Sequence, residues 1–354
     1  MSRRFFFYIF NLAFAAFFLK VEFAHAESWP LNDVLAKRGF VELPLISQSV
    51  YQAKHLVSKK ENSQFHLERY CQDLEKKFKE YGWKDKPCEG VNWQYELNST
   101  QKRPLIYARF GSGKRVTLIL SSVHPDEITP IPIGFRFAKY LQNNPHIYEQ
   151  EDSQVIIAPL VNPDGFLRDK PTRTNANNVD LNRNFFTEDW YAKAHNAWEK
   201  VKSRANRYFP GHFPNSEIET IFQIKLIDDF HPDKILSIHA PLGFLDYDGP
   251  GDQRTKIINK GEHQAKQLVQ AVSKKINNYR IVDYSFFPGS LGNYAGQERK
   301  IPTITVELQT IDAVKHLALW EQFMPGIKQS IVFPFKSNEF ADDLLIPRFS
   351  HIYN

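Results

Sequence analysis

The stretch "RVTLILSSVHPDE", residues 115–127, indicates the fold class of this 354-residue chain. Its first part is an apolar, β-favouring run, which is typical of a strand buried on both faces of a sheet. The run ends in a loop that carries His124 and Glu127. Similar runs follow at "QVIIAPLV", "DKILSIHA" and "IPTITVEL", with helical spacing between them. This alternation predicts an α/β fold with a mixed, mostly parallel twisted sheet and helices on both faces.

The N-terminal segment differs from the rest of the chain. Arg3 and Arg4 precede an apolar run from Phe5 to Leu19, and "AHA" at residues 24–26 has the form of a signal-peptidase site. We therefore expect residues 1–26 to be a signal peptide and the protein to be exported, periplasmic or secreted. An uncleaved membrane anchor is the alternative, but the run is short for a membrane span. We expect no stable span once the signal is removed.

The remaining chain divides by its periodicity. Apolar residues recur at helical spacing from Ser63 to Tyr81. We predict a small helical N-terminal lead-in over residues 27–90 and a single α/β domain over residues 91–354. Within that domain, Ser216 and Glu219 predict a capping box at the start of the helix in "SEIETIFQIKLIDDF".

Composition and charge exclude several classes of protein. The hydrophobic fraction is 42% and the charged fraction 24%, which is ordinary for a globular protein rather than a disordered one. The formal net charge of +5 falls to +3 without residues 1–26, and the chain has no long basic block. We therefore expect no nucleic-acid partner. Export would place Cys71 and Cys88 where a disulfide can form, two free buried thiols being the alternative.

Two histidines follow buried strands and suggest a metal site. His124 and Glu127 alone are weak signals, since the chain repeats the spacing in the polar segment "PHIYEQ", where we expect surface positions. His239 ends another apolar strand in "SIHA". Ligands of open α/β sheets bind at the carboxyl ends of strands, and two histidines with one glutamate hold one type of catalytic zinc. For His239 alone, a hydrogen-bonded core histidine is the alternative.

A glutamate and an arginine-rich stretch could complete such a site. Glu307 lies in the apolar strand "PTITVEL", where a lone carboxylate is costly to bury unless it is paired or near a metal. It is a candidate base, with a position on a solvated strand face as the alternative. The segment "NPDGFLRDKPTRTNANNVDLNRNF", residues 162–185, is typical of surface turns. Its arginines would nevertheless suit a substrate carboxylate.

The order of these motifs resembles the zinc metallocarboxypeptidase family. The similarity spans roughly residues 93–310 and rests on HPDE, NPDG, "RTNANNVDLNRNF", "FPNSEIET", "SIHA", "PGSLGNYAG" and "TITVEL". Within the family it is nearest to the murein peptide amidase A branch and related periplasmic DL-carboxypeptidases. The resemblance implies one Zn²⁺ per chain, a catalytic glutamate, an oxyanion-stabilising arginine and an Asn-Arg pair that binds the terminal carboxylate. By position, the resemblance assigns the zinc ligands to His124, Glu127 and His239 and the catalytic glutamate to Glu307. It assigns the oxyanion-stabilising arginine to Arg173, and the carboxylate-binding pair to Asn182 and Arg183.

Three positions depart from the pattern of the family. Asp126 stands between the first two ligands, where digestive members carry arginine and murein amidases an acidic residue. Tyr284 matches the substrate-capping tyrosine only with an offset of one residue, so a core strand aromatic is the alternative. Asn178 replaces a glycine before "VDLNRNF", and asparagine also tolerates a left-handed backbone. The first departure argues against a general trimmer of protein C-termini.

The resemblance and the expected export together imply a substrate class. We expect zinc-dependent hydrolysis of an amide bond in a peptidoglycan stem peptide or muropeptide, between γ-D-glutamate and meso-diaminopimelate, releasing the latter. Asp248 is a candidate partner for the diaminopimelate ammonium, a turn aspartate being the alternative. The alternative functions are a carboxypeptidase of ordinary peptides, an N-acyl amino acid deacylase and a non-catalytic binder of wall peptides. A mere binder has no need of Glu307.

Overall fold

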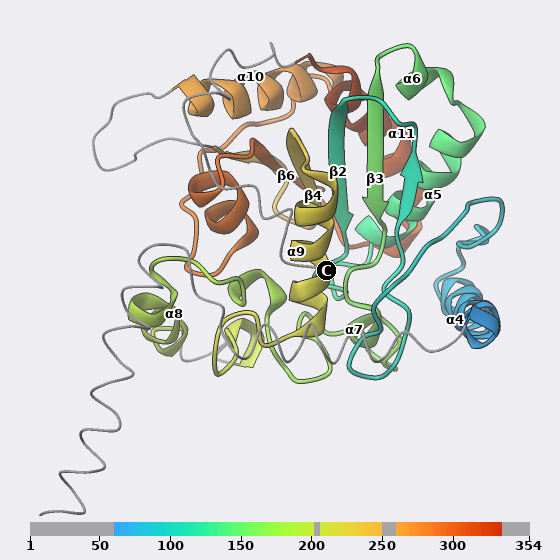
Figure 1. Ribbon diagram of the computed structural model, residues 1–354, viewed down its shortest axis with the longest axis horizontal. Helices are drawn as coiled ribbons and strands as arrows, with labels where there is room; N and C mark the ends of the chain where they lie inside the picture. Colours follow the sequence, from blue (N-terminus) through green and yellow to red (C-terminus); the bar gives the residue numbers. More distant parts are fainter. Residues whose placement is uncertain (1–59, 202–205, 250–259, 335–354) are drawn as a thin grey trace, which may run out of the picture. The chain divides into compact units, whose positions relative to one another are not determined.

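The computed structural model describes residues 60–201, 206–249 and 260–334 (Figure 1). The predicted signal peptide and the lead-in up to residue 59 therefore lie outside the described residues. Within the described part of the chain, no helix combines the length and the apolarity that crossing a membrane requires.

The centre of the fold is a mixed sheet whose strand order is β1-β3-β2-β4-β6-β5. The four inner strands run parallel, and the two edge strands, β1 and β5, run antiparallel to their neighbours. β2 and β4 are buried along nearly their whole length, as their apolar runs predicted. The strands are β1 Ala108–Phe110, β2 Arg115–Ser121, β3 Ser153–Ala158, β4 Lys234–His239, β5 Phe244–Asp248 and β6 Thr303–Glu307.

Helices cover the sheet on both faces, which confirms the predicted fold class. Helix α9 contacts β2 and lies in front of the sheet in Figure 1, whereas α5 and α11 contact β2 from behind. Alternate residues of β2 serve the two sides: Ile119 joins the core cluster formed with α5, α10 and α11, and Leu118 faces the opposite way. The long helices are α5 Pro130–Asn143, α8 Trp190–Glu199, α9 Ile218–Phe230, α10 Lys260–Lys275 and α11 His316–Val332. Shorter ones are α6 His146–Glu149, α7 Pro163–Phe166, η1 Leu181–Arg183, η3 Gly292–Glu298 and η4 Ala313–Lys315.

Helix α4, Lys60–Glu80, packs into the same core as the sheet. Leu74 and Phe78 are fully buried, as the helical spacing predicted. A disulfide joins Cys71 to Cys88 with an S–S distance of 2.04 Å, which confirms the expected pairing and ties α4 to the loop that follows it. The division of the chain at residue 90 stays a prediction.

One local expectation, the capping box, is wrong, and so is one alternative, the turn position of Asp248. Ser216 does not cap α9: its hydroxyl donates to the Glu217 carboxylate at 2.7 Å, and Glu219 accepts instead from the Asn175 amide at 2.9 Å. Asp248 does not lie in a turn, because it is the last residue of β5. The sequence of β5, FLDYD, contains two aspartates, so it was not recognised as a strand.

Candidate metal centre and active site

Neighbouring parallel strands bring His124, Glu127 and His239 together. The first two lie in the loop after β2, and His239 is the last residue of β4, which pairs with β2. Parallel strands end at the same edge of a sheet, so both segments deliver their side chains to one place. The Nδ1 atom of His124 lies 3.1 Å from Glu127 Oε1, and His239 Nδ1 lies 3.0 Å from Oε2.

The geometry of this trio fits one zinc ion. Two ligand atoms bound at ordinary zinc distances in a tetrahedron lie about 3.3 Å apart, close to the separations found here. Among the described residues, these three form the group of His, Cys, Asp and Glu side chains that could hold a metal, with ligand atoms all within 4.8 Å of one another. Both Nε2 atoms are engaged elsewhere, which leaves both Nδ1 atoms facing the centre.

The neighbours of Glu127 favour its ionised form. Burial would raise its pKa, but the adjacent His124 and His239 hold that pKa well below its usual range. Arg173 adds a further charge-assisted hydrogen bond, from Nη1 to Glu127 Oε1 at 3.1 Å.

Asp180 supports the centre from behind, and no sequence reasoning singled it out. This buried carboxylate accepts from the Nε2 atom of His124 at 2.9 Å, from Arg173 Nε at 2.9 Å and from the backbone N–H of Asn182 at 3.0 Å. Burial would raise the pKa of Asp180, but Arg173 and then His124 lower it strongly. A carboxylate behind a metal-binding histidine orients the ring and increases its basicity. Its place in "NNVDLNRNF" was the only available signal.

Glu307 stands beside the trio without belonging to it. It is the last residue of β6 and pairs in register with His239 across the parallel β4–β6 ladder. The side chain is 8% exposed, so the solvated strand face is the wrong alternative. Burial raises the pKa of Glu307, an effect that His239 partly opposes. Such a carboxylate can take up a proton more readily than an exposed one.

A cavity of about 750 Å³ opens in front of these groups and carries the predicted carboxylate clamp. The guanidinium of Arg183 lies 4.1 Å from the ring centroid of Phe287 and donates through Nη1 to the backbone carbonyl of Asn182 at 2.6 Å, and it forms no ion pair with a carboxylate of the described residues. Burial, together with the charge of Arg173, lowers its pKa. Asn182 lines the same cavity and is fixed by the N–H of Leu291, which donates to its Oδ1 at 2.8 Å. Asn182 and Arg183 thus lie together on the wall of the cavity, as the carboxylate clamp requires.

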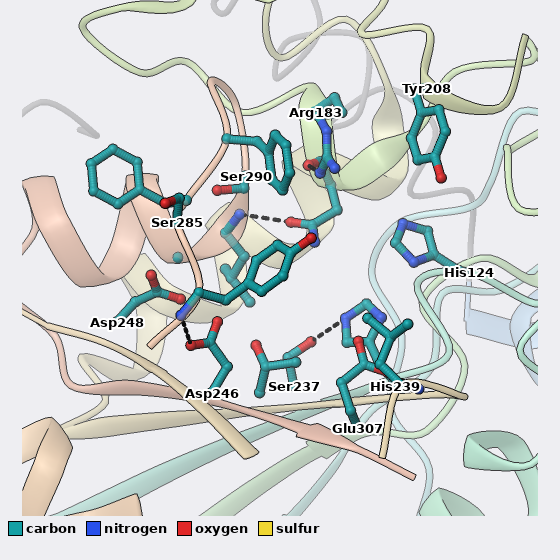
Figure 2. A pocket seen from close by; sticks show the side chains of 18 of the residues that line it. His124, Arg183, Tyr208, Ser237, His239, Asp246, Asp248, Ser285, Ser290 and Glu307 are labelled. Atoms are coloured by element: carbon teal, nitrogen blue, oxygen red, sulfur yellow. Dashed lines mark hydrogen bonds between the residues drawn. The ribbon is translucent and has the colours of Figure 1, made fainter. Parts of the chain in front are cut away.

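The opposite end of the cavity is acidic (Figure 2). Phe244, Asp246 and Asp248 share the cavity side of β5, and the two aspartates pair in register with Thr305 and Thr303 of β6. Burial raises the pKa of Asp246 to about 6. Burial, and then the neighbouring Asp246, raises the pKa of Asp248 well above its ordinary value. No described residue donates a hydrogen bond to the carboxylate of Asp248.

The remaining predicted residues have clear positions. Tyr284 is 46% exposed and lines the cavity, with its ring stacked on Phe244 at 5.9 Å, so the core-aromatic alternative is wrong. Asn178 has a φ of 61°, a left-handed conformation that favours glycine and that asparagine also tolerates. His146 and Glu149 are exposed on α6, as expected for surface positions. Asp126 lines a second cavity and pairs with Arg207.

A mixed sheet whose parallel inner strands bring a His-Glu-His trio together at their carboxyl ends, beside a separate buried glutamate, is typical of a metal-dependent hydrolase. A model of the zinc carboxypeptidase family matches residues 95–328. The chain therefore belongs to the zinc carboxypeptidase family, a family of zinc-dependent hydrolases. This confirms the resemblance, the hydrolase class and the zinc cofactor.

Relatives agree with this assignment. Murein peptide amidase A from Vibrio campbellii is 32% identical over 215 residues, which are 59% of this chain and 76% of the relative. Carboxypeptidase A from Helicoverpa armigera shares the fold with a TM-score of 0.55 and 19% identity, over 73% of this chain and 70% of that one. Bovine thrombin-activatable fibrinolysis inhibitor, solved in complex with a tick carboxypeptidase inhibitor, shares the fold with a TM-score of 0.56 and 16% identity. The match covers 75% of this chain and 95% of that one. The two structures support the fold alone.

Proposed function

We propose that this protein hydrolyses the amide bond between γ-D-glutamate and meso-diaminopimelate in murein stem peptides and releases the diaminopimelate. The observation that carries the proposal is one cavity that joins the metal-binding trio, the guanidinium of Arg183, which has no carboxylate partner among the described residues, and an acidic floor formed by Asp246 and Asp248. The relative named murein peptide amidase A supports the substrate class.

The side chains divide the work of such a reaction. A zinc ion bound to the trio would polarise the scissile carbonyl and make water more acidic. Glu307 removes the proton from the attacking water and returns it to the leaving amine, a task suited to a buried carboxylate with a raised pKa. Arg183 and Asn182 bind the α-carboxylate of the terminal residue, because a guanidinium fork matches a carboxylate. Arg173, at the edge of the cavity, stabilises the developing oxyanion.

The acidic floor suits the side chain of diaminopimelate. Glu307 and Phe244 are partners across the β5–β6 ladder, and Asp246 lies two residues further along β5, a step of about 7 Å. A side chain that starts at the clamp and reaches down the cavity can place its distal ammonium near Asp246 or Asp248. The distal carboxylate would meet the hydroxyls of Ser285 and Ser290, which also line the cavity.

One observation favours a second candidate. Diaminopimelate is lysine with an extra carboxylate on the carbon that bears the distal ammonium, and the described residues of the floor include no cation for that carboxylate. A carboxypeptidase that removes lysine from ordinary peptides would therefore fit the floor equally well. Asp126 and the family branch favour the murein substrate.

We infer export to the periplasm from the N-terminal sequence pattern, and this gives the protein access to murein. Periplasmic localisation is supported by Arg3, Arg4 and the apolar run that follows them. A fractionation experiment with the full chain tests it: recovery in the cytoplasm at full length would contradict export.

The test of the proposed function compares substrates. Zinc-loaded protein is incubated with L-alanyl-γ-D-glutamyl peptides that end in meso-diaminopimelate or lysine, with tetra- and pentapeptide stems, and with an α-linked peptide ending in lysine. Mass spectrometry should show release of diaminopimelate from the tripeptide. Glu307→Gln is the inactive control. Cleavage of the α-linked lysine peptide alone would replace the proposal with the second candidate, and no cleavage of any peptide would remove both.

A further inference from the structure

Helix α4 precedes the residues that the family model matches, yet it contacts the loop that leads to Arg173. The contact is made by Lys77, whose side chain is buried at 7% exposure. Its Nζ donates to the backbone carbonyls of Arg168 at 2.9 Å and of Asp169 at 3.2 Å. Charge-assisted hydrogen bonds are stronger than neutral ones, so a buried ammonium with two carbonyl partners fixes the backbone that carries them.

The same loop is tied to the segment beyond Arg173. Arg168 is partly buried, and its Nη2 donates to the backbone carbonyl of Asn175 at 3.0 Å. The N–H of Thr172 donates to the carbonyl of Gly165 at 3.1 Å. Arg173 therefore lies between backbone positions that are held on both sides, and the ammonium on α4 holds the nearer side.

Helix α7, which precedes the loop, has anchors of its own. Asp164 is fully buried and accepts from the hydroxyl of Ser99 and from Nη1 of Arg103, each at 2.7 Å. The ring of Phe166 is stacked on that of Tyr81, with centroids 6.2 Å apart. Loss of the ammonium on α4 would therefore free the loop after α7 rather than α7 itself.

The position of this loop matters because Arg173 must meet several partners at once. Its Nη1 donates to Glu127 Oε1 at 3.1 Å and its Nε to Asp180 Oδ2 at 2.9 Å, and the side chain also lines the first cavity. A misplacement of about 1 Å near a reacting centre can cost about 10²-fold in rate. A loop that shifts would move the guanidinium away from the developing oxyanion.

We propose that Lys77 is a positioning residue that acts through the backbone of residues 168–169 and holds Arg173 in place for the reaction. This inference rests on the proposed function. Lys77 lines neither cavity and belongs to none of the groups that bind substrate or metal. Its effect therefore falls on the transition state, which Arg173 stabilises, rather than on substrate binding.

The first test separates kcat from KM. Lys77→Met removes the ammonium and keeps an apolar stem, and Lys79→Met is the matched control, because Lys79 is an exposed lysine of the same helix. On L-alanyl-γ-D-glutamyl-diaminopimelate, Lys77→Met should lower kcat by about tenfold per zinc-loaded molecule and leave KM within about twofold, as loss of a contact made only in the transition state does. Lys79→Met should change neither. An unchanged kcat for Lys77→Met, even in a less stable protein, would overturn the proposal.

A double-mutant cycle tests whether Lys77 acts through Arg173. Arg173→Ala alone should lower kcat by roughly 10²–10³-fold, the size of a lost oxyanion donor. Adding Lys77→Met should then cost no more than about twofold, because residues that act as a unit are not additive. A further loss of about tenfold would contradict the coupling. If Lys77→Met does not fold, Lys77→Gln takes its place, since this shorter neutral side chain cannot hold both carbonyls.

Hydrogen exchange provides a readout without turnover. Exchange of the amides in residues 167–176, measured by mass spectrometry, should be about tenfold faster in Lys77→Met than in wild type and unchanged in Lys79→Met. Exchange in β2 and β4 should not change. Wild-type exchange in residues 167–176 of Lys77→Met would overturn the positioning role and leave the proposed function intact. Failure of wild type to cleave any peptide would remove the proposed function, and the exchange comparison would then decide the role of Lys77 by itself.

Discussion

The substitution Asp180→Asn tests whether the carboxylate behind His124 controls metal binding. Asp180 Oδ1 accepts from His124 Nε2 and from the N–H of Asn182, and Oδ2 accepts from Arg173 Nε at 2.9 Å. Asparagine has one carbonyl oxygen, so it can keep the first two bonds only by turning its NH₂ group toward the Arg173 donor. The variant therefore loses one buried charge-assisted hydrogen bond, about 1.5–3 kcal/mol of stability. It also loses the negative charge behind the imidazole, which weakens zinc binding by roughly 10–100-fold.

The assay separates these two effects. Zinc affinity is measured by competition with a chromophoric chelator, and stability by urea unfolding of the metal-free protein. Asp229→Asn is the matched control, because Asp229 is an exposed partner of Lys225 on α9. A folded Asp180→Asn protein whose zinc affinity stays within twofold of wild type would refute the role assigned to Asp180.

Three further predictions concern the cavity and the core. Glu307→Gln should retain zinc by elemental analysis yet lose roughly 10²-fold or more in turnover; retained activity would assign the base elsewhere. Arg183→Ala should raise KM for a peptide with a free terminal carboxylate far more than for its amide, and equal effects on both would contradict the clamp. Burial raises the pKa of Glu219 from 4.5 to about 7, so the folded state binds this proton more tightly than the unfolded state. The contribution of this group to stability is therefore complete below pH 4.5 and falls as the pH rises toward 7. Glutamine cannot ionise, so the stability of Glu219→Gln relative to wild type, measured by urea unfolding, should increase by roughly 2–3 kcal/mol between pH 5 and pH 8. A difference that does not change with pH would contradict the raised pKa.

Local sequence was enough to predict the inner strands and the metal-binding trio. β2, β3 and β4 are buried on both faces, so their sequences are nearly continuous apolar runs. A histidine or glutamate at the end of such a run is conspicuous, because it interrupts an apolar pattern where ligands of α/β sheets bind. Glu307 was recognisable for the same reason.

β5 and the capping box show where local pattern failed. The sequence of β5, FLDYD, places carboxylates where a strand in an apolar core would place apolar residues. Asp246 and Asp248 face a polar cavity rather than the core, and so the strand resembled a turn. Ser216 and Glu219 have the spacing of a capping box, but Asn175 is close in space and binds Glu219 instead.

The sequence by itself determined the α/β class and the side chains available for the metal, because both leave a local pattern of spacing or hydrophobicity, and it made the Cys71–Cys88 disulfide the expected pairing. Only the tertiary structure decided which polar groups support them. Asp180 reaches His124 across 56 positions, and Asp246 enters the cavity through the register of an edge strand. Such contacts depend on strand pairing and loop packing between distant segments, and neither can be predicted from the residues that flank each side chain in the sequence.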